Sequence, residues 1–66
     1  MQNTLLIKAS FYVLFLGQPV HLVTKARDNS LIIRGGSLEF AQMHPSEYEA
    51  TKVARAIGGD VAVMID

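Results

Sequence analysis

The sequence predicts an α+β fold: a four- to five-stranded, mainly antiparallel β-meander with one α-helix packed on one face, in the order β-β-β-β-α-β. Three observations predict it. Apolar residues alternate with a period of two through most of residues 4–43. Glycine, proline, asparagine and aspartate separate the alternating runs. One stretch, 46–59, instead has the apolar spacing of a helix. The 66 residues make a single domain, 1–66.

Four alternating runs are expected to form strands before the helix, at 4–16, 19–27, 30–34 and 37–43. The turns between them are Gly17-Gln18, a type II′ candidate with glycine first, then Asp28-Asn29 and Gly35-Gly36. Closing all three as two-residue turns brings one mostly apolar set of side chains to a common face. That set is Phe11, Val13, Phe15, Val20, Leu22, Thr24, Ala26, Leu31, Ile33, Leu38 and Phe40.

The helix over 46–59 has a defined start and a defined end. Ser46 and Glu49 have the spacing of a capping box. The buried stripe is expected at Ala50, Val53, Ala54 and Ile57, and Gly58 suits the left-handed position after the last turn.

The alternating run 60–66 predicts a last strand after the helix. We expect it to return antiparallel beside the first strand, because that long strand otherwise lacks a partner on one edge. Parallel pairing with the fourth strand is the other possibility.

One helix can cover only one face of the sheet, and the remaining face is unusually apolar for a solvent face. We therefore expect a protein–protein interface there. Its anchors are expected to be Tyr12, Leu14, Leu16, Val23, Ile32 and Arg34.

Composition also favours association. Half of the residues are hydrophobic, and a chain this short has few ways to bury them alone. There is no cysteine, so a disulfide cannot supplement the core. We expect a cytoplasmic homodimer, formed through the uncovered sheet face or through an edge strand, without a membrane span, that also binds an unidentified protein partner.

No catalytic constellation is evident in the sequence. The two histidines, His21 and His44, are too few and too separate for a metal site, and Ser46 is explained as a helix cap. We expect a protein that is not an enzyme and has no cofactor.

Nucleic-acid binding is the alternative function. Lys8, Lys25, Arg27 and Arg34 could neutralise phosphates on the open sheet face, with Tyr12 and His21 nearby. A net charge of zero and a single usable aromatic side chain argue against it.

Two stretches of the sequence resemble small uncharacterised phage and prophage proteins. The first is the aromatic opening run 11–14, Phe-Tyr-Val-Leu. The second is the alanine-rich helix that ends in Gly58-Gly59 before a last strand. The resemblance implies an accessory protein, often an inhibitor or modulator of a host protein. It implies no particular functional residues.

Overall fold

The structure, a computed structural model that describes residues 8–65, is an α+β fold with one antiparallel sheet and one helix. Its strands are β1 (Ala9–Phe15), β2 (Gln18–Lys25), β3 (Leu31–Gly35) and β4 (Asp60–Ile65). The sheet order is β3-β2-β1-β4, and the last strand lies antiparallel beside the first, as expected. The part of the first predicted strand at 4–7 lies outside the described residues.

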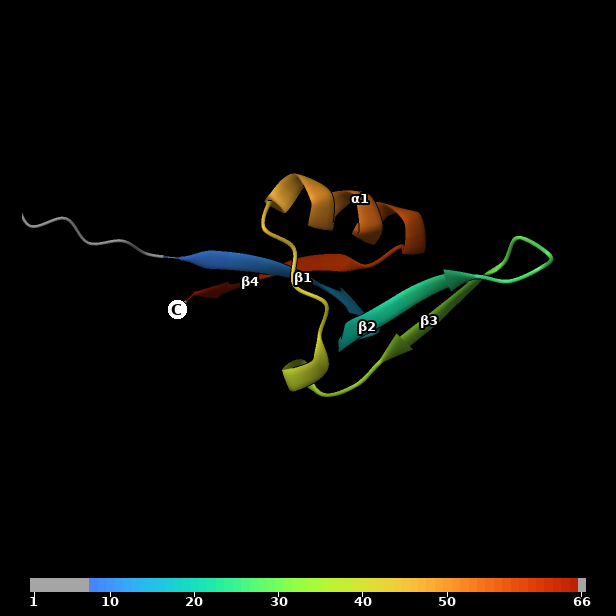
Figure 1. Cartoon of the computed structure of the whole chain (residues 1–66), viewed down its shortest axis with the longest axis horizontal. Coiled ribbons are helices and arrows are strands. Elements are labelled where there is room, and N and C mark those ends of the chain that lie inside the picture. Colours follow the sequence, from blue (N-terminus) through green and yellow to red (C-terminus); the bar gives the residue numbers. More distant parts are fainter. Residues whose placement is uncertain (1–7, 66) are drawn as a thin grey trace, which may run out of the picture.

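The helix α1 (Glu47–Ile57) packs on one face of β1 and β4, and a short 3₁₀ helix η1 (Leu38–Phe40) lies on the other side of the sheet (Figure 1). Ser46 and Gly58 cap the two ends of α1 as predicted. The Ser46 hydroxyl accepts a hydrogen bond from the Glu49 backbone N–H at 3.2 Å. Gly58 adopts the left-handed conformation, with φ of 76°, and its N–H donates to the Ala54 carbonyl oxygen.

The predicted fourth strand at 37–43 is wrong. Ser37 caps η1 by accepting from the Glu39 N–H, and the chain then runs extended to His44. Strand β2 pairs with β1 at only two positions before the strands separate. The segment that connects η1 to α1 fills the gap between the two strands. His44 exchanges two backbone hydrogen bonds with Phe11, and the Gln42 N–H donates to the Val20 carbonyl oxygen. These bonds satisfy backbone groups that a regular hairpin would have paired.

The first turn also differs from the prediction. It is centred on Leu16-Gly17, and both residues have positive φ, as a type I′ turn requires. Phe15 therefore pairs with Gln18 and Leu14 with Pro19, a shift of two residues that keeps the same face.

The β2–β3 hairpin differs by one residue from the predicted register. Ala26 bonds to Ser30 across a three-residue loop in which Asn29 has a φ of 70°, and Lys25 pairs with Leu31. A bulge between Val20 and Leu22 then reverses the face that the rest of β2 presents. Val23 consequently packs against the core, whereas Leu22 is exposed.

The core of the described chain is small. Among residues 8–65, the buried side chains are Val13, Val20, Ala50 and Ala54, and two of these are alanines. A ring of half-buried apolar residues surrounds them: Phe11, Phe15, Val23, Ile33, Val53, Ile57 and Val61. The core lies between α1 and the middle of β1 and does not extend along β3.

Candidate interaction surface

The six residues predicted as interface anchors do not form one patch. Tyr12 and Leu14 lie on β1 and alternate with the core residues Phe11 and Val13, so they occupy the face away from α1, where both are half-buried. Leu16 is at the tip of the first turn and is 88% exposed.

The other three predicted anchors belong to the β2–β3 hairpin. Ile32 and Arg34 are exposed and alternate with Ile33, which packs against the core. Val23 is on the core side, so its predicted placement on the open face is wrong because of the bulge in β2.

The four basic residues of the alternative reading are also separated. Lys8 precedes β1, and the start of β1 is at the opposite end of the sheet from the β2–β3 loop that contains Arg27 (Figure 1). Lys25 is two residues after Val23 on β2 and therefore shares its face. Arg34 pairs with Leu22 and is on the other face. The structure does not gather these cations on one sheet face.

Exposed apolar side chains concentrate in three places outside the core. The first is the end of β4, where Val63 is 51% and Ile65 is 64% exposed. The second is the hairpin, with Leu22, Leu31 and Ile32. The third is the connection after β3, with Leu38, Phe40 and Met43. Among these, the sequence predicted only Ile32 as an interface residue. It placed four others on the covered face, and the structure exposes them: Leu22, Leu31, Leu38 and Phe40. The uninterrupted apolar run 61–65 was the signal for the first group.

The connection is fixed to β2 by His21. In its Nε2-protonated tautomer, the His21 ring donates to the Ser37 carbonyl oxygen at 2.7 Å. The Phe40 ring meets the His21 ring edge-on, with centroids 6.0 Å apart. His21 therefore has a structural partner on each side of its ring.

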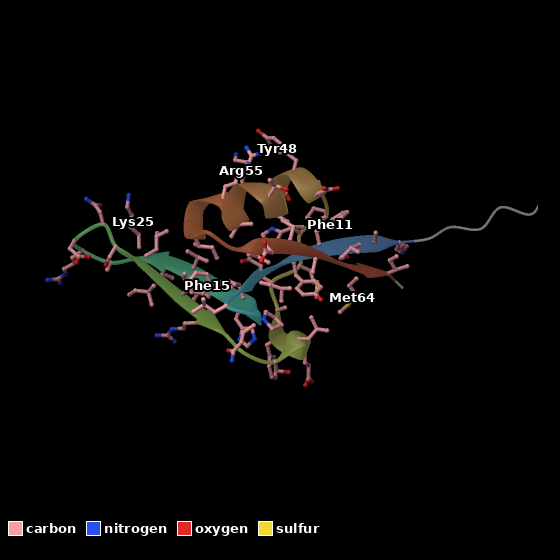
Figure 2. The ribbon with its side chains drawn as sticks, turned by 180° about the vertical axis from the view of Figure 1, so that it is seen from behind. Phe11, Phe15, Lys25, Tyr48, Arg55 and Met64 are labelled. Atoms are coloured by element: carbon pink, nitrogen blue, oxygen red, sulfur yellow. The ribbon has the colours of Figure 1, made fainter. Side chains whose placement is uncertain are left out.

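The outer face of α1 is polar apart from Tyr48 and Ala56. Tyr48 and Arg55 point from α1 away from the sheet, whereas Met64 is on the opposite side of the molecule (Figure 2). The Lys52 Nζ lies 5.5 Å from the centre of the Tyr48 ring, a cation–π contact. A shallow hollow of about 340 Å³ lies among Glu47, Tyr48, Thr51, Lys52 and Arg55.

Titratable groups offer little chemistry in the described part of the chain. No three histidine or carboxylate side chains there are close enough together to hold a metal ion. The Ser30 hydroxyl and the Ser30 backbone N–H both donate to Asp28 Oδ1. The hydroxyl bond first, and the backbone bond to a smaller extent, lower the pKa of Asp28 below its ordinary value. Asp28 is in an exposed hairpin loop, so these bonds stabilise a turn.

No helix within residues 8–65 combines the length and the apolar character that a bilayer crossing needs. Comparisons of the chain with protein-family models, with curated proteins and with solved structures found no match.

Proposed function

We propose that this protein is a non-catalytic protein–protein interaction module, a homodimeric accessory protein that inhibits or modulates another protein. The observation that carries the proposal is the imbalance between core and surface. Four side chains, two valines and two alanines, are buried among residues 8–65, while ten large apolar side chains are exposed. A second protein surface would remove part of that apolar area from water, at roughly 25 cal/mol per Å².

A core this small needs a further source of stability, and association is the one that the chain's composition allows. It has no cysteine for a disulfide, and the described residues hold no cluster suited to a structural metal. The cytosol is the proposed compartment, because a cysteine-free chain loses no stabilising bond under reducing conditions.

Interaction with protein is better supported than interaction with nucleic acid. The exposed apolar side chains outnumber the cations, and the cations are divided between the two faces and the two ends of the sheet. Binding to nucleic acid depends on several cations that contact phosphates together.

The dimer is tested by light scattering after size exclusion, with the loaded protein varied from nanomolar to tens of micromolar. We expect a dimer mass at the upper end and a melting temperature that rises with protein concentration, because association stabilises only the folded chain. A monomer mass throughout, with a melting temperature independent of concentration, would contradict the homodimer.

The accessory role needs its own experiment. Affinity purification of the tagged protein from its native host, followed by mass spectrometry, is expected to recover a stoichiometric protein partner that resists nuclease treatment. Recovery of nucleic acid that is lost at raised salt would favour the alternative function instead.

A further inference from the structure

The free edge of β4 is the part of the surface that is best suited to one defined partner. Strand β4 is at one end of the sheet order, so within residues 8–65 one side of its backbone has no neighbouring strand (Figure 1). Edge strands are templates for pairing, and proteins usually protect them with charges, prolines or bulges. Residues 61–65 read Val-Ala-Val-Met-Ile and contain none of these.

The hydrogen bonds of β1 show which backbone groups are at that edge. Phe11 uses both its N–H and its C=O on His44, at 2.9 and 2.7 Å, on the side of β1 away from β4. In an antiparallel ladder the bonding direction alternates along a strand, so Ser10, Tyr12 and Leu14 bond to β4. Their partners on β4 are Met64, Ala62 and Asp60. Val61, Val63 and Ile65 therefore direct their N–H and C=O groups outward.

The opposite edge of the sheet is less suited to pairing. The Ala26 N–H donates to the Ser30 carbonyl oxygen, so the same alternation directs Leu31, Ile33 and Gly35 outward on β3. Arg34 lies among them and puts a charge on that edge, and Gly35 has no side chain to pack against a partner.

We infer that two copies of this chain pair antiparallel through β4, about a twofold axis at Val63, to form one continuous eight-stranded sheet. The inference rests on the proposed homodimer and names its interface. This register pairs Val63 with Val63 of the second copy, and Val61 with Ile65 of the second copy. It is the twofold register in which all three outward residues of each strand find partners, because Val61 and Ile65 are equidistant from Val63.

The same register extends the apolar surface on both faces. On the helix side, Val63 meets its own copy across the axis, with Phe11 beside it on β1 of each copy, and the exposed Ile65 comes beside Val61 of the second copy, which packs against the core under α1. On the other side, Ala62 comes beside Met64 of the second copy. The pairing that we infer covers 61–65.

Single-cysteine variants test this register, because the natural chain has no cysteine. Val63→Cys places the two thiols opposite each other, within the Cα separation that a disulfide requires. Ile65→Cys is the matched control: the two residues at 65 are four positions apart along the strands, about 13 Å, which is too far. We expect rapid oxidation to a covalent dimer for Val63→Cys alone.

An affinity measurement complements the cross-linking. Val63→Lys puts a charge on the edge at a half-exposed position, and Ile32→Lys makes the same change on the hairpin, where exposure is similar. We expect Val63→Lys to raise the dimer dissociation constant at least about tenfold, which is the effect of a 1.4 kcal/mol loss. Ile32→Lys should leave it unchanged, and far-ultraviolet circular dichroism should show both variants folded.

The outcomes separate this inference from the proposed function. A wild-type dimer in which Val63→Cys fails to cross-link, or in which Ile65→Cys cross-links instead, overturns the β4 register while the homodimer stands. A wild type that stays monomeric overturns both the β4 register and the homodimer. The same holds if the β4 edge is found paired with a strand of a different protein while this chain does not self-associate.

Discussion

Two halves of this molecule use similar apolar strands and differ in what covers them. The helix half consists of β1, β4 and α1, and the hairpin half consists of β2 and β3 (Figure 1). The helix half contributes Val13, Ala50 and Ala54 to the buried core, whereas the hairpin half contributes only Val20, at its base. Further along the hairpin, Leu22, Leu31 and Ile32 are exposed.

The length of α1 explains the difference. Eleven residues at about 1.5 Å of rise per residue make a helix of roughly 16 Å, which spans about five strand residues. It covers the middle of β1 and the start of β4, and the far end of the hairpin lies beyond it (Figure 1). A period-two apolar pattern therefore predicts a strand with a preferred face, and a second layer has to be present before that face is buried.

The largest expected effect tests the comparison directly. Val13→Ala opens a cavity in the helix half and is expected to cost about 2–3 kcal/mol of unfolding free energy. The matched change in the hairpin half, Ile32→Ala, removes a side chain that is already 45% exposed and should cost less than about 1 kcal/mol. Urea unfolding at one fixed protein concentration measures both. Equal costs would mean that the hairpin has its own covering layer in solution.

A smaller and opposite effect is expected at the turn that joins the two halves. Leu16 has a φ of 51° and is almost fully exposed, so its side chain gains little and its backbone conformation is unfavourable. Leu16→Asn creates an Asn-Gly type I′ turn and is expected to stabilise the protein by about 1 kcal/mol.

The loop at the far end of the hairpin supplies the control. Asn29 has a φ of 70°, and Asn29→Leu should destabilise by a comparable amount, about 1 kcal/mol. Thermal unfolding measures both variants. If Leu16→Asn lowers stability instead, the Leu16 side chain makes a contact in solution that outweighs the backbone cost.

The smallest expected effect is a change in the pKa of Asp28, which shows whether the β2–β3 loop keeps its hydrogen-bonded geometry in solution. The bonds from Ser30 lower the folded-state pKa of Asp28 below its unfolded value. They therefore stabilise the protein above the unfolded pKa, and this contribution is lost as the pH falls through the folded pKa. An NMR titration of the Asp28 carboxyl carbon measures the pKa. Ser30→Ala removes the hydroxyl donor and should raise it toward the ordinary value; an unchanged pKa would show that the loop does not hold this geometry.

By itself, the sequence determined the parts of the fold that local chemistry controls. The capping serine, the spacing of Ala50 and Ala54, and the left-handed Gly58 specify α1 and its ends, because each acts within one or two turns of chain. Alternation was enough to identify β1, β2, β3 and β4, and the unpaired side of the first strand was enough to place the last one.

Tertiary structure decided register, faces and the path of residues 37–44. The three-residue loop before Ser30 and the bulge near His21 each move the pairing by one residue, and a one-residue step exchanges the two faces of a strand. That is why Val23 turned inward, onto the face opposite to Ile32 and Arg34. The run 37–43 alternates like a strand, yet it formed η1 and a link to β1. The separation of β1 from β2 left Phe11 and Val20 with backbone groups that needed partners, and no local pattern records such a need.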